Sequence, residues 1–385
     1  MKWLVSITAA VSVTALCVRA AAGYCAERPE ISAKAAAVIS ADTGETLYAL
    51  NAGEKLPMAS TTKIMTALLC IESGGLYDEF TVDSEAVKVE GSSMGLREGD
   101  TVTKYALCCG MLLPSGNDAA NAAAVRIAGS LDAFAELMNS RARDMGLSRT
   151  YFVTPSGLEG EGHGSSAGDM ALLAREALSN DIFRSICSQS SMKVSFGDPP
   201  CERQLKNTNK LLGMYDGVYG VKTGFTDEAG RCLVSACERD GKDLICVTLN
   251  DRNDWDDHMA LYDWCFREAA LREVKLPGDI TAGIVGAVDG KLRLMPERDS
   301  ISVTTVSGSD RDFSFAVLAP PFVYAPVRTG EQIGELAVYF RGRETERVPL
   351  VAAEDKVYSD GRKKQEKSLI ERIKHKIGSI FSHKG

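Results

Sequence analysis

Histidine, proline and long apolar runs are all scarce in this sequence of 385 residues. With four histidines and no HExxH motif, a histidine-rich metal site is not expected. Only 12 prolines, beside 45% hydrophobic and 25% charged residues, exclude extensive disorder. A formal net charge of −8 gives no general affinity for nucleic acid. After residue 22, no apolar stretch is long enough to cross a bilayer.

The first residues have the pattern of an export signal. Lys2 precedes an apolar run, Trp3 to Val18, that is short for a membrane span, and the small residues Ala20 to Ala22 follow it. We therefore expect a signal peptide over residues 1–22 and an exported mature chain. Removing the signal takes away Cys17 and leaves ten of the 11 cysteines. In an exported protein this even number admits disulfides, but no CxxC is present, so buried free thiols stay an open alternative.

Hydrophobic periodicity predicts strands at both ends of residues 30–271 and helices between them. The two sets of strands must complete one sheet, which indicates a single α+β domain over 30–271. Strands are expected at 35–40, 46–50, 218–225, 231–238 and 243–250, and helices at 61–72, 104–113, 118–128, 131–145, 169–178 and 254–270.

Pro277-Gly278 marks a boundary, after which the pattern changes to short alternating strands with Gly, Asp and Ser turns. We expect a small β-sandwich-like domain over residues 276–353. The chain then ends in a basic tail, 362–385, with eight Lys/Arg and two Asp/Glu, and its apolar residues recur at helical spacing. This tail has the pattern of an amphipathic helix that lies on an anionic membrane surface without spanning it.

Ser60 and Lys63 are the first candidate chemical pair. Residues three apart share one face of a helix, so the Lys63 amine can lie beside the Ser60 hydroxyl. The spacing alone is weak evidence, because Ser190 and Lys193 also fit it and because Ser60 could be a simple helix N-cap. A Ser-His-Asp site would need His163 or His258. We interpret His163 as a solvated loop residue and His258 as a packing or capping residue, since no GxSxG motif accompanies them.

Two further motifs strengthen the Ser60 interpretation. Ser115-Gly116-Asn117 occupies a turn between two expected helices, and Lys222-Thr223-Gly224 lies on an expected strand of the sheet. The three motifs, in this order, resemble the signature set of the penicillin-recognising serine enzymes. The flanking residues (57–67, 113–120 and 221–230) are similar to one branch of them, the low-molecular-weight penicillin-binding proteins that act as serine D-alanyl-D-alanine carboxypeptidases. The likeness runs from about residue 35 to 270.

The resemblance implies a fold and a reaction. The fold is a β-lactamase or penicillin-binding transpeptidase-like domain followed by a small all-β domain. The reaction removes the terminal D-alanine from peptidoglycan stem peptides ending in D-Ala-D-Ala, through a Ser60 acyl-enzyme, in maturation of the vegetative wall or the spore cortex. β-Lactam antibiotics would bind the same site. The resemblance further implies an enzyme on the outer face of the cytoplasmic membrane or in the cell wall, with no cofactor, metal or nucleic acid.

Roles for single residues also follow from the resemblance. Ser60 is the nucleophile, Lys63 the general base, Ser115 the proton relay and Asn117 an orienting residue. Substrate-binding roles fall on the third motif: Lys222, Thr223, Gly224 and, as a backbone oxyanion donor, Phe225. Phe225 departs from the family, in which Tyr or His is usual at this position.

Three alternatives share some of these features. A serine β-lactamase has the same signature, but no ExxLN-like segment is present to supply a deacylating glutamate. A transpeptidase or an endopeptidase would use the same acyl-enzyme with another acceptor or another substrate bond. A catalytically silent wall-binding protein would have no chemical reason to keep Ser60, Lys63 and Lys222 together.

Overall fold

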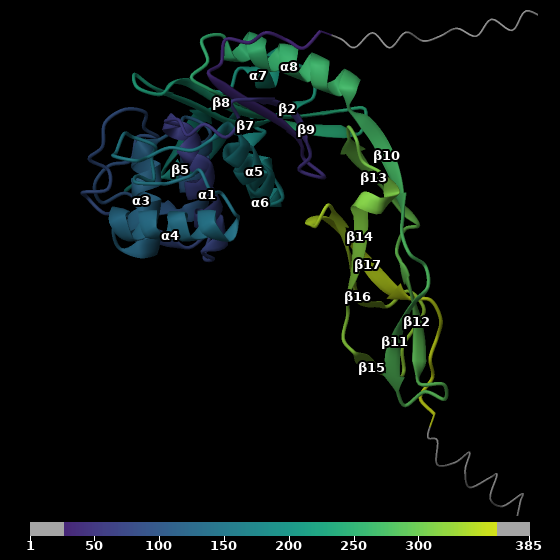
Figure 1. The fold of residues 1–385 in the computed structure, drawn as a ribbon. Coiled ribbons are helices and arrows are strands. Elements are labelled where there is room, and N and C mark those ends of the chain that lie inside the picture. The colour runs from purple at the N-terminus through teal and green to yellow at the C-terminus, as the bar shows by residue number, and fades with distance from the viewer. Residues whose placement is uncertain (1–26, 360–385) are drawn as a thin grey trace, which may run out of the picture.

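A computed structural model of the protein describes residues 27–359. The expected signal peptide (1–22) and basic tail (362–385) lie outside these residues. The described chain has two regions (Figure 1): a broad N-terminal region (27–269) of helices around a sheet, and a narrow C-terminal region (270–359) of strands that extends from it. The predicted α+β class is confirmed.

Five antiparallel strands form the central sheet in the order β2-β1-β9-β8-β7. β1 (Ala35–Ser40) pairs with β9 (Lys242–Leu249), so the two ends of the N-terminal region meet in the middle of the sheet. The other strands are β2 (Thr46–Leu50), β7 (Val218–Thr226) and β8 (Gly230–Arg239). The expectation that distant strands complete one sheet is therefore confirmed.

Helices cover both faces of this sheet. α8 (Asp254–Glu268) packs on one face and α5 (Ala167–Leu178) on the other (Figure 1). α1 (Lys63–Glu72) is the central helix, and it packs against α5 and four further helices: α2 (Lys104–Leu112), α3 (Asn117–Ala128), α4 (Leu131–Asp144) and α6 (Asp181–Cys187).

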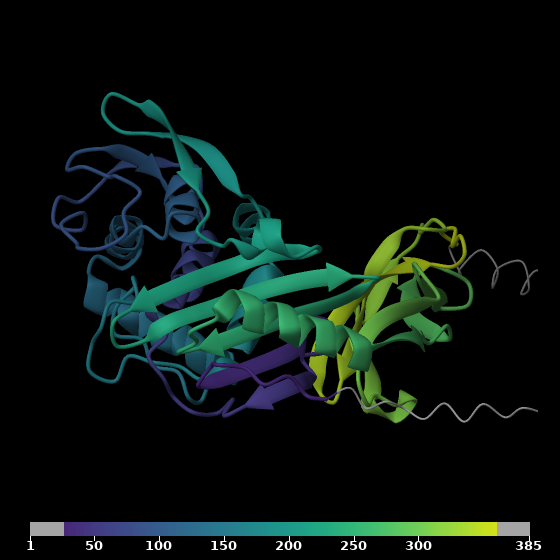
Figure 2. The same ribbon diagram turned by 90° about the horizontal axis from the view of Figure 1, so that it is seen from above.

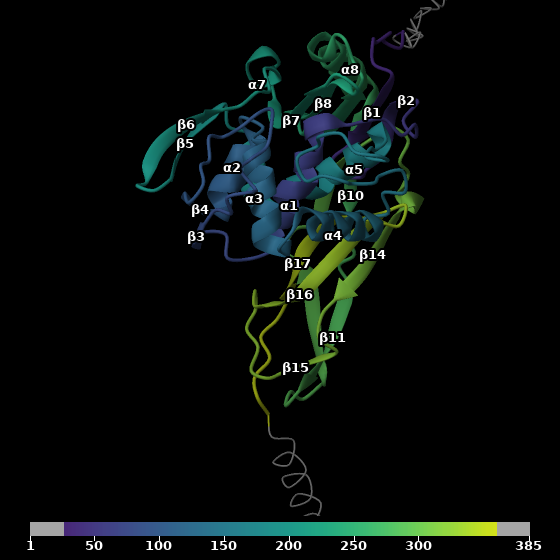
Figure 3. The same ribbon diagram turned by 90° about the vertical axis from the view of Figure 1, so that its left-hand side faces the viewer.

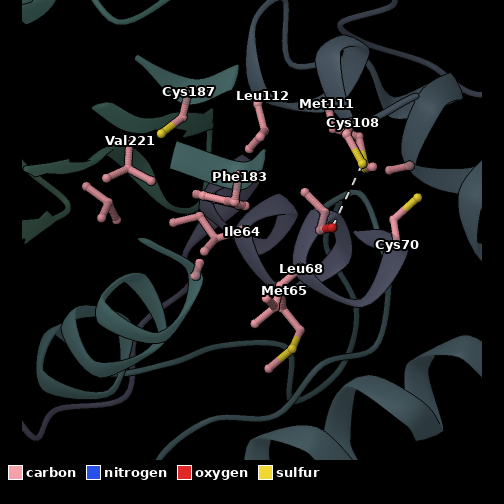
Figure 4. Close-up of a cluster of buried hydrophobic side chains, with 14 of the residues drawn as sticks. Ile64, Met65, Leu68, Cys70, Cys108, Met111, Leu112, Phe183, Cys187 and Val221 are labelled. Carbon is pink, nitrogen blue, oxygen red and sulfur yellow. Dashed lines mark hydrogen bonds between the residues drawn. The ribbon is translucent and has the colours of Figure 1, made fainter. Parts of the chain in front are cut away.

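The apolar core fixes the position of α1. Figure 4 shows Ile64, Met65 and Leu68 of α1 among side chains of α2, α6 and β7, and all three are essentially inaccessible to solvent. Full burial of a side chain of this size contributes about 1.5–3 kcal/mol. A residue at the N-terminal end of α1 is therefore held by the core behind it.

Several short elements were not expected from the sequence. The largest is the hairpin of β5 (Ser191–Phe196) and β6 (Cys201–Lys206), which projects from the body (Figures 2 and 3). The others are β3 (Glu79–Thr81), β4 (Thr101–Thr103), α6 and α7 (Leu211–Met214). The expected helix over 254–270 ends at Glu268, because Ala269 is extended and leads into β10 (Ala270–Lys275).

The C-terminal region is built almost entirely of strands. A six-stranded sheet has the order β14-β16-β17-β12-β11-β15, and β10 pairs with β13 beside it. Its core is apolar, with Leu292, Leu294 and Leu336 in one cluster and Val338 and Phe340 in another. The remaining strands are β11 (Ile280–Val285), β12 (Lys291–Pro296), β13 (Ser300–Thr305), β14 (Phe313–Leu318), β15 (Phe322–Tyr324), β16 (Gln332–Phe340) and β17 (Arg343–Ala352).

Hydrogen bonds join the two regions at the β1–β2 turn. The Asp42 carboxylate accepts from the Thr304 amide at 2.8 Å, and the Thr43 hydroxyl donates to the Thr304 carbonyl at 3.1 Å. From α5, Arg175 donates to the carbonyl of Glu344 at 2.9 Å. The C-terminal region is thus attached to the end of the sheet away from α1.

The cysteines between residues 27 and 359 are all free thiols, and all but Cys201 are buried. Burial raises the pKa of Cys187, Cys232 and Cys265 to about 12. The sequence left open disulfides or buried free thiols, and the described part of the chain has free thiols. Its core uses cysteine as a small apolar side chain.

Candidate active site

Ser60 lies at the start of the central helix, beside Lys63. A 3₁₀ turn, η1 (Ala59–Thr62), precedes α1, and Ser60 makes no capping hydrogen bond there. Its hydroxyl oxygen instead lies 2.8 Å from the Lys63 amine. Ala59 has a φ of 47°, in the left-handed region, where strain of about 1–3 kcal/mol is typical of functional sites. The alternative that Ser60 is a simple N-cap is therefore wrong.

The Lys63 amine has three partners. Besides Ser60, it contacts the Asn117 Oδ1 atom at 2.7 Å and the Ser156 carbonyl at 2.6 Å. Asn117 donates its own Nδ2 to the Glu90 carbonyl at 2.7 Å, which fixes its oxygen towards Lys63. Two of the three partners can therefore only accept a hydrogen bond from Lys63.

The environment of Lys63 favours its neutral form. The side chain is fully buried, and this burial holds the pKa of Lys63 well below its usual value of 10.5. The charge of Lys222 lowers it further, and Asp118 opposes the shift. A neutral amine donates two hydrogen bonds, which the two acceptors take. Its lone pair then faces the Ser60 hydroxyl, as a general base requires.

The second motif lies on the turn before α3. Ser115 has a φ of 68° and is almost fully buried at the entrance to the site. The buried Asp118 carboxylate accepts from the amides of Met94, Gly95 and Leu96 at 3.0 Å each. These bonds tie the loop over residues 92–96 to the start of α3, where Asn117 begins the helix. Asp118 is thus a positioning residue for Asn117.

The third motif brings β7 against the nucleophile. A Cβ atom on Gly224 would lie 3.1 Å from the Ser60 amide nitrogen and 3.0 Å from the Met58 carbonyl, so any larger residue would crowd this approach. The Lys222 amine donates to the Thr223 carbonyl at 2.9 Å, and burial lowers the pKa of Lys222 to about 7. The Thr223 hydroxyl lies 2.7 Å from that of Thr208.

A cleft of about 360 Å³ opens over these groups. Ser60, Ser115, Thr223, Gly224 and Phe225 line it, while Lys63, Asn117 and Lys222 are buried. The structure thus brings all eight expected residues to one place. The competing pair, Ser190 and Lys193, lies at the projecting hairpin, where Lys193 is exposed and pairs with Glu202 at 2.8 Å.

One wall of the cleft was not expected from the sequence. Arg231 of β8 lies opposite Phe225 of β7, and its guanidinium donates to the Asp254 carboxylate at 2.6 and 2.9 Å. It also lies over the Trp255 ring, 5.4 Å from the centroid. The Asp254 side chain is 4% exposed and that of Arg231 is 42% exposed, so the buried acid holds an accessible cation. A hairpin between the strands expected at 218–225 and 231–238, which was not predicted from the sequence, would have placed Arg231 beside Phe225.

Neither histidine of the described chain reaches the cleft. The interpretation of His163 as solvated is wrong: its Nδ1 accepts from the Val153 amide and its Nε2 lies 2.9 Å from the Thr62 hydroxyl. Burial lowers the pKa of His163 to about 4. His258 packs as expected, fully buried between the hydroxyls of Ser235 and Thr248. Within residues 27–359, no group of three or more His, Cys, Asp or Glu could hold a metal ion.

Comparisons with known proteins find related enzymes over most of the chain. The family model described as D-alanyl-D-alanine carboxypeptidase matches residues 22–253. The D-alanyl-D-alanine carboxypeptidase DacF of Bacillus subtilis is 33% identical over 84% of this chain and 85% of its own length. DacC of Escherichia coli is 32% identical over 87% of both chains.

Solved structures give the same picture. The D-alanyl-D-alanine carboxypeptidase DacD of Francisella tularensis matches 86% of this chain and 95% of its own, with a TM-score of 0.60 and 25% identity. The Streptomyces K15 DD-transpeptidase matches 63% of this chain and all of its own, with a TM-score of 0.60 and 31% identity. The first likeness extends into the C-terminal region, and the second covers a part about the size of the N-terminal region.

Proposed function

The chain belongs to the D-alanyl-D-alanine carboxypeptidase family, and on that premise we propose that Ser60 and Lys63 carry out its reaction. The enzyme is a serine-type peptidase that removes the terminal D-alanine of peptidoglycan peptides ending in D-Ala-D-Ala, and β-lactams bind to it. We assign the catalytic domain to residues 30–271 and the small β domain to residues 276–353. The observation that carries the residue assignment is the set of three partners around the Lys63 amine.

In the first step, neutral Lys63 removes the Ser60 hydroxyl proton while Ser60 Oγ attacks the penultimate D-alanine carbonyl. The oxygen of that carbonyl becomes an oxyanion, which the backbone amides of Ser60 and Phe225 stabilise. The close approach of Gly224 to the Ser60 amide supports this pairing. Removal of such a donor typically costs about 10²–10³-fold in rate.

In the second step, the C–N bond breaks and D-alanine leaves. Its amine takes the proton that Lys63 accepted, and Ser115 relays that proton. Ser115 is suited to this role because it lines the cleft close to the entrance, whereas Asn117 lies below and orients Lys63. A water molecule then attacks the acyl-enzyme with Lys63 again as base, which releases the shortened peptide and restores Ser60.

Recognition of the terminal carboxylate needs hydrogen-bond donors and positive charge. We assign it to Thr223 and to the buried Lys222 next to it, and we add Arg231 as an accessible cation of the cleft wall. Arg231 is suited to this role because a guanidinium binds a carboxylate through two parallel hydrogen bonds. Asp254 holds it in place from the N-terminus of α8.

The location of the enzyme is also a proposal. We infer that it is exported by the signal peptide and held at the outer face of the cytoplasmic membrane, or in the wall, by the tail over 362–385. No helix among residues 27–359 is long and apolar enough to cross a membrane. A chain ending at Asp360 should keep its activity and stop sedimenting with anionic vesicles.

The activity is tested with the purified mature chain and a diacetylated tripeptide ending in D-Ala-D-Ala. We expect steady release of D-alanine from the parent protein and from Ser190→Ala, which removes the serine of the competing pair. Ser60→Ala should fold and release none, because the nucleophile is gone. Release by Ser60→Ala would contradict the assignment, and transfer of the acyl group to an added amine in place of water would identify a transpeptidase.

A further inference from the structure

Six apolar side chains gather at the far end of the C-terminal region. They are between 47% and 77% exposed, and we call them the apolar tip: Val285, Val288, Phe322, Tyr324, Val357 and Tyr358. Single exposed hydrophobic residues are ordinary on protein surfaces. A contiguous group of them marks an interaction surface.

Three separate segments are fixed together to form this tip. β11 and β15 pair in parallel, with Val285 opposite Tyr324. The Ser359 amide donates to the Gly286 carbonyl at 2.7 Å, which lays the last described residues against the β11–β12 turn. A Cβ atom on Gly286 would lie 3.0 Å from the Tyr358 ring. The tip is therefore a defined surface of the fold.

The strand pattern separates the tip from the core. In β15, Val323 packs against the apolar core while Phe322 and Tyr324 face outward, with their ring centroids 5.6 Å apart. In β11, Ile284 is buried and Val285 faces outward. Alternation of this kind normally places polar residues on the outer face. Here the outer face is apolar and aromatic, which requires a function other than core packing.

Pairing with another strand is a poor explanation for this surface. β15 is an edge strand, but it is only three residues long. Pro320 and Pro321 precede it and Pro326 follows it, and proline blocks the addition of a strand to an edge. The Lys356 amine at this end pairs with two carboxylates, that of Asp289 at 2.5 Å and that of Glu354 at 3.2 Å. These charged groups are paired with one another, and the six exposed side chains of the tip offer apolar contact.

The chain that follows the tip identifies its partner. Ser359 ends the described residues directly on the tip, and the segment from Arg362 onwards carries a net charge of +6. Tyrosine rings and apolar side chains beside a basic segment are typical of proteins that lie on an anionic bilayer. β7 and α1, which carry the active site, lie at the other end of the molecule from β11 and β15 (Figures 1 and 3).

We propose that the apolar tip enters the interfacial layer of an anionic lipid membrane, so that the C-terminal region stands on the membrane with the active site held away from it. The inference rests on the proposed membrane association of residues 362–385 and adds a second point of contact. Two contacts fix an orientation, which a tail alone does not.

Tryptophan placed at the tip tests this proposal in the full mature chain. Val288→Trp reports on the tip, and Val317→Trp, at an exposed site on β14 at the opposite edge of the same sheet, is the matched control. Vesicles of phosphatidylglycerol and phosphatidylcholine, with brominated acyl chains, are the probe. When vesicles are added, we expect the tryptophan fluorescence of Val288→Trp to shift to the blue and to be quenched, relative to the parent protein. We expect neither change for Val317→Trp.

A second variant measures the contribution to binding. Val288→Ser with Tyr324→Ser changes only exposed side chains, so it should fold and release D-alanine as the parent does. Its affinity for the vesicles should fall roughly tenfold, because two apolar side chains no longer leave water.

The outcomes separate the tip from the tail. Sedimentation of the full chain with vesicles, but without quenching at residue 288 or a loss in the double variant, would overturn the tip and leave the tail proposal standing. Failure of the full chain to sediment would overturn both, without bearing on D-alanine release. A blue shift of the Trp fluorescence of Val288→Trp in the absence of lipid would also overturn the membrane contact. If that shift depends on protein concentration, a second copy of the chain covers the tip. If it does not, the chain's own tail covers the tip.

Discussion

The two regions of the molecule differ in what they bury. In the described chain, every buried charged or histidine residue lies in the N-terminal region: Lys63, Asp100, Asp118, Asp169, Lys222, Asp251, Asp254, Asp257 and His258. The C-terminal region buries only Thr304 and Thr305 among polar residues, and both lie at the junction with the other region. Its charges form ion pairs at the surface, as Arg347 does with Glu344 at 2.7 Å.

This difference shows that the free-energy cost of burying charged groups falls on the region that carries the active site. Removing a charge from water is unfavourable unless partners compensate it. The C-terminal region buries no whole charged residue, so this cost is small there. The N-terminal region accepts it for Lys63 and Lys222, whose pKa values fall as a result, and offsets it for Asp118 with backbone amides. The comparison therefore predicts that changes in the two regions have opposite effects on activity and stability.

The largest expected effect is on activity, at Lys63. Lys63→Met should lower D-alanine release by about 10³-fold or more, because the base is lost. Lys63→Arg should be as inactive, since arginine stays protonated. A lysine whose pKa is lower in the folded state disfavours folding at neutral pH, so Lys63→Met removes that cost.

The same removal leaves two buried acceptors unpaired, at about 1–3 kcal/mol. The two contributions oppose each other, and we expect the stability of Lys63→Met to stay within about 1 kcal/mol of the parent. Thermal unfolding measures this, with the exposed Lys193→Met as control. A folded Lys63→Met protein that still releases D-alanine would break the assignment.

The reverse effect is expected from the C-terminal core. Leu336 is fully buried in an apolar cluster, so Leu336→Ala should cost about 2–5 kcal/mol of that region's stability. D-Alanine release per folded molecule should not change, because no group of the cleft comes from this region. Denaturant unfolding tests the predicted loss of stability, and D-alanine release at 25 °C from the same sample tests the predicted unchanged activity. A matched fall in activity of the folded protein would show that the regions are coupled.

A smaller effect is a shift in pH dependence. The positive charge of Lys222 lowers the pKa of Lys63, so Lys222→Gln should raise the pKa of Lys63. Neutral Lys63 then forms at higher pH, and the rising limb of the acylation rate should move upward by about one pH unit. The rate of acylation by a labelled penicillin, followed from pH 5 to 9, measures the limb. An unchanged or downward-shifted limb would contradict the electrostatic role of Lys222.

The sequence was sufficient to predict an element or a site residue where its role depends on side chains close to it in the chain. Periodicity placed β1, β7, β8 and β9 and most of the helices around α1 within a few residues of their observed bounds. All the expected site residues lie in or directly after the three motifs, and each motif is recognisable because it is a short run of chemically specific side chains. They meet in one cleft beside β7, a strand of the sheet that distant segments were expected to complete.

The sequence was insufficient to predict a residue's role where that role depends on its backbone atoms or on contacts with distant parts of the chain. Ser156 holds Lys63 through its carbonyl, from 93 residues away, and any residue has a carbonyl. Arg231 and Asp254 each have an ordinary separate interpretation, as a polar strand residue and an acidic residue at a helix start. Their pairing across the cleft appears only once β8 and α8 are packed. The burial of His163 depends likewise on a loop that carries no periodic signal.

The most direct test of the account is the position of the acyl group. The parent protein is labelled with penicillin, quenched, digested with trypsin and analysed by mass spectrometry. The account predicts one adduct, on Ser60 in the tryptic peptide Leu56–Lys63, and its loss in Ser60→Ala. An adduct in the peptide that contains Ser190, or no adduct in a protein that releases D-alanine, would contradict it.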